Sequence, residues 1–257
     1  MTRRQHSQNA RDDWRTPPEF FAGLHGRFLF SGDAFASADN TLCTRHMTGE
    51  AGRDALVDDW FPQLGRRPFV QPPYSRLAAS MERTIELWHR STTTRPVDTF
   101  ETAVALIPTN METKPWQEGA ANSDLPGVLG AASEIWMVRR RIGFIDPTTG
   151  AACAKNVIGS AVAVFDHRHR LGTPPRLGTL CARTGEPIHA HDWDYWRDEV
   201  LRNLSRAWSV VEGKAPTPPD IEEMSREFLG SLPLQPGEGY AAIAAADSLL
   251  AKLQERG

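Results

Sequence analysis

The tetrapeptide Gln71-Pro72-Pro73-Tyr74, directly after the apolar pair Phe69-Val70, limits the possible fold of this chain more than any other feature. Proline has no amide proton for a sheet ladder and restricts the residue before it to extended geometry, so the strand must end here. The two prolines then hold backbone carbonyls and one aromatic ring in a rigid turn at the carboxyl end of that strand. Open α/β sheets bind their ligands in this region, which makes the tetrapeptide the first candidate for a functional site.

Apolar runs that alternate with helical patterns predict an α/β fold. Thr16-Pro17-Pro18-Glu19 is typical of a helix start, with Thr16 as the N-cap and prolines in the first turn. The helix is expected to end near Gly26, and a second helix is expected from Leu77 to about residue 90. Alternating strands and helices favour a parallel, doubly wound sheet. The expected strands are residues 28–30, 69–70, 103–107, 135–138 and 161–165.

From about Trp193 the pattern changes to an all-helical one. A helical stripe is followed by a proline-rich linker at 215–219, and two further helices are expected near 220–230 and 240–255. The stripe comprises Trp193, Trp196, Val200, Leu204, Trp208 and Val211. The predicted division is a flexible N-terminus (1–12), an α/β domain (13–170), a connecting loop (171–192) and a helical C-terminal region (193–257).

Composition excludes several classes of protein. The chain has 257 residues, 40% of them apolar and 24% charged, which fits a soluble globular protein. No apolar run is long enough to span a membrane and none follows the N-terminus as a signal core, so we expect a cytoplasmic protein. Cys43, Cys153 and Cys181 are far apart, and no metal site or disulfide is expected, even near His189 and His191. Because the net charge is −3, any nucleic-acid binding must come from a local basic face.

A set of short motifs over roughly residues 12–167 resembles the phage-type DNA N6-adenine methyltransferase (Dam-like) family. The motifs, in order, are Trp14-Arg15-Thr16-Pro17, residues 28–34, Asp54-Ala55-Leu56, Trp60, the tetrapeptide, Leu106-Ile107-Pro108, residues 141–144 and Gly159-Ser160. The resemblance implies a Rossmann-like, S-adenosylmethionine-dependent sheet that methylates N6 of a flipped adenine in double-stranded DNA, in a protein encoded by a phage. It does not cover the C-terminal all-helical appendage. Gln71 departs from the Asp, Asn or Ser that the family has at this position.

The resemblance assigns the chemistry to the tetrapeptide. The side-chain oxygen of Gln71 and the carbonyl of Pro72 would accept both N6 hydrogens, which frees the nitrogen lone pair for attack. Pro73 would hold the turn, and the Tyr74 ring would stack on the extruded base. Gln offers the same amide oxygen as Asn, but one methylene further out, and a displacement of about 1 Å can cost on the order of 100-fold in rate.

The resemblance also indicates where S-adenosylmethionine would bind. Asp33 is expected to meet the methionine end of the cofactor, and Asp54 precedes a segment similar to the family's adenosine-binding segment. Simpler roles remain open: Asp33 as a helix N-cap, Asp54 as a solvated loop carboxylate and Thr16 as a cap alone. The candidate cofactor-binding residues are Trp14, Thr16, Pro17, Asp33, Ala34, Asp54 and Leu56.

Two basic runs are candidates for DNA contact, because cations bound to phosphates give sequence-independent affinity. They contribute Arg139, Arg140 and Arg141, and Arg168 and Arg170, with Arg141 in a family position. A basic run is more often simply a solvated surface, and this interpretation stays open for both.

Three functions remain open from the sequence. The first is a site-specific DNA adenine-N6 methyltransferase. The second is a degenerate homologue that binds DNA or cofactor without transferring methyl groups, suggested by Gln71. The third is an amino-methyltransferase for another amine, in cytosine N4, RNA or protein Gln. The sequence predicts neither the recognition site nor the oligomeric state.

Overall fold

The computed structural model describes residues 12–37, 40–93, 100–119, 124–153, 158–192 and 195–196. The chain divides into two compact units, one of Met1–Pro17 and Phe30–Gly178 and one of Pro18–Leu29 and Thr179–Gly257. The four-part division expected from the sequence stays a prediction. The helical appendage lies outside the described residues, apart from Tyr195 and Trp196.

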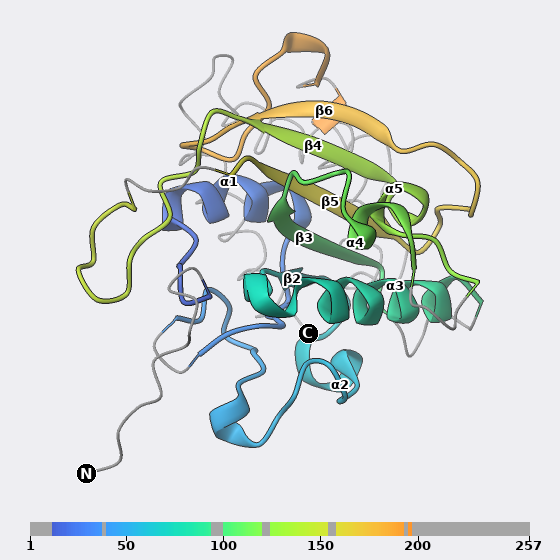
Figure 1. The fold of residues 1–257 in the computed structure, drawn as a ribbon, viewed down its shortest axis with the longest axis horizontal. Helices are drawn as coiled ribbons and strands as arrows, with labels where there is room; N and C mark the ends of the chain where they lie inside the picture. Colours follow the sequence, from blue (N-terminus) through green and yellow to red (C-terminus); the bar gives the residue numbers. More distant parts are fainter. Residues whose placement is uncertain are drawn as a thin grey trace, which may run out of the picture. The chain divides into compact units, whose positions relative to one another are not determined.

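Most of the expected strands, and the long helix after the tetrapeptide, are confirmed. The longest described helix runs from Leu77 to Thr93, and the strands after it cover the expected apolar runs. The described elements in chain order are α1 (Pro18–Phe28), β1 (Gly32–Asp33), η1 (Gly49–Ala51), α2 (Trp60–Leu64), β2 (Pro68–Val70), η2 (Tyr74–Arg76), α3 (Leu77–Thr93), β3 (Thr102–Pro108), α4 (Lys114–Gln117), α5 (Val128–Ala131), β4 (Glu134–Arg139), β5 (Ser160–Asp166) and β6 (Arg176–Cys181) (Figure 1).

The described sheet has the strand order β1-β2-β3-β5-β4-β6 and is mixed, not fully parallel as expected. The pairs β1–β2 and β2–β3 are parallel, but β5 pairs antiparallel with both β3 and β4. Strands β1, β2, β3 and β4 therefore all run in one direction. Strand β5, which lies between β3 and β4, runs in the opposite direction. The prediction of an all-parallel sheet is wrong. A run of apolar residues indicates a buried strand, but it does not indicate the direction of that strand relative to its neighbours.

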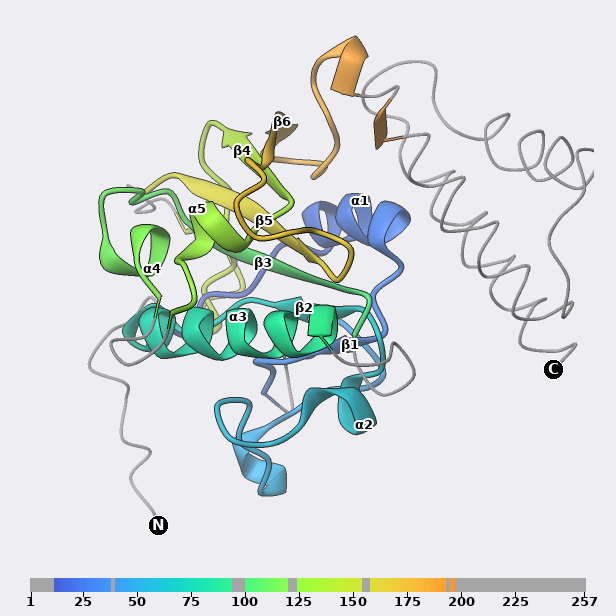
Figure 2. The ribbon, with the colours of Figure 1, turned by 90° about the vertical axis from the view of Figure 1, so that its right-hand side faces the viewer.

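Helices α3, α4 and α5 cover one face of this sheet (Figure 2). Their apolar side chains, including Ile85, Trp88 and Trp116, form one core with alternate residues of β3 and β5, such as Ala105 and Phe165. Side chains of a strand alternate between its faces, so every second residue of β3 packs under the helices. The core fixes the strands whose ends carry the candidate site.

The expected strand at 28–30 is wrong. Helix α1 continues to Phe28, and Leu29 then has φ 50°, which ends the helix. Phe20, Leu24 and Phe28 are all buried and lie four residues apart, so Phe28 belongs to the apolar stripe of the helix. Thr16 is not the N-cap either, because α1 begins at Pro18.

Strand β1 is short and starts at a glycine that packs closely on α2. A Cβ at Gly32 would lie 2.7 Å from Cα of Leu64, so only glycine fits at this contact. Helix α2 is capped by the Asp59 side chain and buries Trp60 and Leu64. The close packing brings Asp33, the last residue of β1, beside the end of β2.

The strand directions define two edges of the sheet. At the first, which we call the tetrapeptide edge, β2 ends at Val70, β3 ends at Pro108, β4 ends at Arg139 and β5 begins at Ser160, paired with Pro108. At the opposite edge, the start of β3 at Thr102 pairs with the end of β5 at Asp166. The two predicted basic runs follow β4 and β5 and therefore lie at different edges.

Candidate active site

The tetrapeptide leaves β2 as a rigid extended turn. Pro73 has φ −54° and ψ 139°, and the chain then passes through η2 directly into α3. A cavity of about 40 Å³ lies at this turn. Around it the structure brings together the four predicted catalytic residues and two of the predicted cofactor-binding residues, Trp14 and Asp33. The lining residues are Asp12, Trp14, Asp33, Phe35, Asn40, Leu42, Gln71, Pro72, Pro73, Tyr74 and Phe144.

The segment Asp12–Thr16, which we call the N-terminal strap, binds the tetrapeptide through polar contacts. Gln71 Nε2 donates to the Trp14 carbonyl at 3.0 Å, and the Thr16 hydroxyl donates to Gln71 Oε1. The Asp12 carboxylate accepts the Ser75 backbone N–H at 2.9 Å. Both ends of the Gln71 amide are therefore held by residues far away in the sequence.

Three of the aromatic rings that line the same cavity lie against one another. Trp14 stacks on Phe144 with ring centroids 6.0 Å apart and meets Tyr74 edge-on at 6.3 Å. Paired backbone hydrogen bonds between Arg15 and Ile145, of 3.0 and 2.9 Å, fix the strap against this segment. Phe144 was not among the predicted site residues, although it ends one of the family-like motifs. Its position in the wall depends on a long-range pairing that the local sequence does not show.

Asp33 is a buried carboxylate at this cavity, with 4% of its surface exposed. Burial raises its pKa to about 6, although backbone N–H groups of Phe35 and Leu42 and the nearby His46 oppose the shift. Burial, together with the charge of Asp33, raises the pKa of the neighbouring Cys43 thiol to about 12. Asp33 caps no described helix, because a turn follows it; its carboxylate accepts from Phe35 N–H at 3.2 Å.

A second cavity, of about 350 Å³, adjoins the first and shares Phe35 and Pro73 with it. Ala34 and Asp54, both predicted to contact the cofactor, line this second cavity. Its volume falls within the range of small-molecule sites, whereas the first cavity is far below that range.

The exposed Asp54 is held at the rim by short-range contacts. Its carboxylate accepts the Leu56 backbone N–H at 3.0 Å, and Arg76 lies 4.0 Å away as an ion pair. Leu56 itself lines a third cavity, of about 370 Å³, beside residues of α3 such as Met81. Thr16 and Pro17 line neither of the first two cavities.

The other tryptophans near the family-like motifs are structural. The Trp60 indole donates to the Ala55 carbonyl at 2.8 Å, and the Trp116 indole donates to the Pro108 carbonyl at 2.9 Å. Both rings are fully buried, whereas Trp14 is only partly buried and lines the cavity. Of these three tryptophans, Trp14 is therefore the one that lies at the candidate site.

Of the two basic runs, Arg139, Arg140 and Arg141 lie at the tetrapeptide edge. All three are exposed; Arg139 is the last residue of β4, and the other two follow it. Arg141 lies against Gly159, just before β5, because a Cβ on that glycine would be 2.9 Å from the guanidinium. This run adjoins the edge where the candidate site opens.

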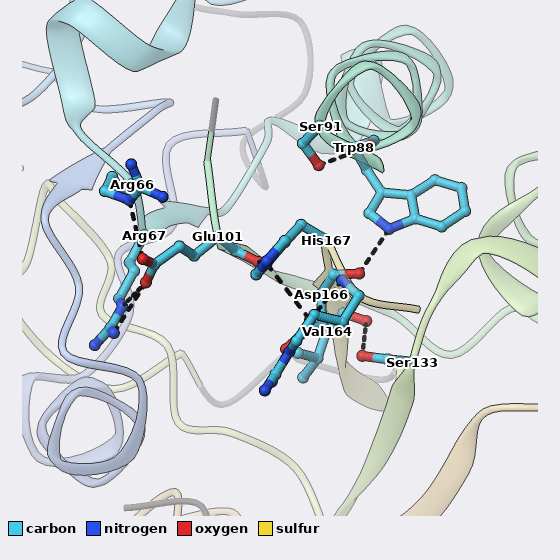
Figure 3. Close-up of polar contacts among 10 residues, drawn as sticks. Arg66, Arg67, Trp88, Ser91, Glu101, Ser133, Val164, Asp166 and His167 are labelled. Carbon is cyan, nitrogen blue, oxygen red and sulfur yellow. Dashed lines mark hydrogen bonds and ion pairs between the residues drawn. The ribbon is translucent and has the colours of Figure 1, made fainter. Parts of the chain in front are cut away.

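Arg168 lies at the opposite edge, where it binds the carboxylate of Asp166. Its Nε donates to the Asp166 carboxylate at 2.8 Å, and although burial raises the pKa of Asp166, the bonds from Arg168 lower it below its ordinary value. Nearby, Glu101 lies between Arg66 and Arg67 and pairs with each at 3.0 Å (Figure 3). Glu101 and Asp166 therefore offset part of the positive charge at this edge.

The part of the chain that the structure describes has no group of three or more side chains suited to a metal ion. His189 and His191 stack with ring centroids 5.6 Å apart. None of the described helices combines the length and apolar character needed to cross a membrane.

Residues 3–177 match the model of the family described as DNA N-6-adenine-methyltransferase (Dam). The chain belongs to this family, and its mixed sheet is consistent with a methyltransferase-like fold.

A curated relative is the DNA N-6-adenine-methyltransferase of Escherichia phage T1. It is 27% identical over 159 residues, which cover 60% of this chain and 63% of the relative. The chain thus aligns with less than two thirds of that relative's length.

Proposed function

We propose that this protein is an S-adenosylmethionine-dependent DNA adenine-N6 methyltransferase. One observation carries the proposal: the Gln71 amide, the Tyr74 ring and the buried carboxylate of Asp33 meet at one cavity. That cavity lies at the carboxyl ends of parallel strands in a chain of the Dam family.

In this proposal the tetrapeptide prepares the acceptor amine. Gln71 Oε1 and the Pro72 carbonyl accept the two N6 hydrogens, which draws the nitrogen toward tetrahedral geometry. Tyr74 stacks on the extruded base and orients it. The cavity of about 40 Å³ is too small for a purine, so the aromatic rings of the strap and of Phe144 must move when the base enters.

The neighbouring groups fit the cofactor. Asp33 is a buried carboxylate with a raised pKa, and a bound ammonium would stabilise its charged form. The adjoining cavity of about 350 Å³ fits the adenosine portion, with Asp54 at the rim for hydroxyl groups of the ribose. When bound, S-adenosylmethionine supplies the electrophilic methyl group. The protein contributes orientation and a carboxylate at the methionine end.

The DNA path follows from the edge at which the site opens. Arg139, Arg140 and Arg141 extend from that edge and are exposed, so we assign the phosphate contacts to them. Arg168 and Arg170 follow β5 to the opposite edge, where Asp166 binds Arg168. Of the two basic runs, the first is therefore the preferred DNA contact.

A second candidate is a homologue that binds cofactor and DNA without transferring methyl groups. The observation in its favour is that Thr16 already donates to Gln71 Oε1, the oxygen that must accept from the amine. An amide oxygen has two lone pairs, however, so one remains for the amine.

The test is a methyl-transfer assay with labelled S-adenosylmethionine and unmethylated duplex DNA, RNA or protein as acceptor. We expect label in DNA, recovered as N6-methyladenine after digestion to nucleosides. Gln71→Ala should abolish this product, whereas Leu177→Ala, at an exposed position on β6, should not. Label in cytosine, RNA or protein would assign another amine, and no label with retained cofactor binding would favour the second candidate.

A further inference from the structure

We propose that the N-terminal strap positions the Gln71 amide, with Thr16 and the Trp14 carbonyl as its two anchors. The inference rests on the proposed function, because it explains how a glutamine acts at a position where the family has shorter side chains. Thr16 is then a positioning residue for catalysis and not a cofactor ligand.

The contacts define which end of the amide faces which partner. The carbonyl of Trp14 can only accept, so the group 3.0 Å from it must be Nε2 of Gln71. Oε1 therefore faces Thr16, whose hydroxyl proton is donated to it. If the amide were flipped, Oε1 of Gln71 would face the carbonyl oxygen of Trp14, and neither oxygen can donate a hydrogen bond.

A glutamine needs such anchoring more than an asparagine does. Its side chain has one more rotatable bond, so an unanchored amide would sample many positions and rarely present its oxygen to the amine. Anchored at both ends, Oε1 keeps one lone pair for the acceptor amine. Donation from Nε2 to Trp14 also polarises the amide and strengthens that oxygen as an acceptor.

The anchors are themselves fixed. Thr16 is 2% exposed, and the strap is held by Asp12 bonded to Ser75 N–H and by Arg15 paired with Ile145. The position of the Gln71 amide is thus set by one side chain and one backbone carbonyl, 55 and 57 residues away in the sequence.

The first test compares Thr16→Val, which removes the hydroxyl at nearly constant volume, with Thr16→Ser, which keeps it. We expect Thr16→Val to lower kcat by about 10- to 100-fold, the cost of a misplaced group. The dissociation constant for S-adenosylmethionine should not change, and Thr16→Ser should restore most of the rate. Thr84→Val is the matched control, because Thr84 is equally buried and donates to Ser80 within α3. If Thr16→Val does not fold, Thr16→Ala makes the same comparison with Thr16→Ser.

The second test places Thr16→Val in a Gln71→Asn background. Asn is too short to keep both contacts, so the effect of Thr16→Val on kcat should disappear there. An equal loss in both backgrounds would overturn the inference, because Thr16 would then act through something other than Gln71.

A readout without turnover separates this inference from the proposed function. The side-chain amide signal of Gln71 in an NMR spectrum, assigned by its loss in Gln71→Ala, should shift in Thr16→Val and not in Thr84→Val. A protein that methylates nothing but shows this shift would refute the proposed function and support the anchoring. Full activity of Thr16→Val with no amide shift would refute the anchoring and leave the proposed function intact.

Discussion

The protonation state of Asp33 depends strongly on neighbouring charges and hydrogen bonds, because its carboxyl is nearly fully buried. Its pKa is about 6 in the folded protein and 3.8 in an unperturbed chain. Below pH 3.8 both states are protonated; between the two values the unfolded chain ionises first, so the stability of the ligand-free protein falls as pH rises. Above about pH 6 the folded protein carries the full cost of burying the ionised Asp33 carboxylate, on the order of 3 kcal/mol.

We therefore expect Asp33→Asn to stabilise the ligand-free protein at pH 8 and to have little effect at pH 4. Denaturant unfolding at the two pH values measures the difference. Equal effects at both pH values would show that the Asp33 carboxyl carries no burial cost.

The same substitution should weaken cofactor binding. Loss of a charge-assisted interaction with the ammonium predicts about tenfold or more weaker binding of S-adenosylmethionine by calorimetry, a loss of about 1.5–3 kcal/mol. For the unmodified protein, affinity should rise as pH increases through about 6, where Asp33 ionises. An unchanged affinity for Asp33→Asn would remove Asp33 from the cofactor site.

Tyr74 has a role that should be separable from cofactor binding. Replacing it with alanine removes a stacking surface for the extruded base, worth about 1–3 kcal/mol, so methylation should fall while cofactor affinity is kept. Methyl-transfer rates and calorimetry on the same preparation test this. A loss of both methyl transfer and cofactor binding would mean that Tyr74 supports the fold of the site instead.

At the level of elements, β1 depends on its contact with α2. A methyl group at Gly32 would overlap the backbone of Leu64, which cannot move away as a flexible side chain could. We expect Gly32→Ala to lower the free energy of unfolding by about 1–3 kcal/mol. Gly49→Ala is the control, because nothing lies within 4 Å of a Cβ there. Similar unfolding of the two variants would contradict the close packing.

Local patterns predicted those elements whose apolar residues have one consistent spacing. The run after the tetrapeptide places Leu77, Met81, Ile85 and Trp88 on one face and became α3 as expected. The run at 28–30 failed because three adjacent apolar residues fit a helix end as well as a strand. The spacing of apolar residues distinguishes a helix end from a strand only when the residues on either side of the run are included.

The candidate site shows a similar division between local and long-range information. The tetrapeptide predicts its own turn, since two prolines restrict the backbone whatever surrounds them. The bond from Thr16 to Gln71 and the stacking of Trp14 on Phe144 join segments that are far apart in the chain. Such pairs depend on the assembled sheet, and no local pattern encodes them.

For the whole molecule, the two edges of the sheet predict different roles for the two basic runs. Arg139→Gln with Arg141→Gln should weaken duplex DNA binding and lower the salt slope by about one for each phosphate that is no longer neutralised. Arg168→Gln with Arg170→Gln has the same charge change at the opposite edge and should leave both the affinity and the slope nearly unchanged. Binding titrations at several salt concentrations compare the pairs. A larger effect of the second pair would place the DNA at the other edge.

The reversed direction of β5 has a consequence for how this protein can diversify. Because β4 ends and β5 begins at the tetrapeptide edge, the connection between them leaves the core and returns to it on the same side. Phe144 and Ile145 of this connection hold the cavity wall and the strap, so its length and sequence can change beyond them without shifting the register of either strand. A change of length in that later part leaves in place the strand ends that carry the candidate site.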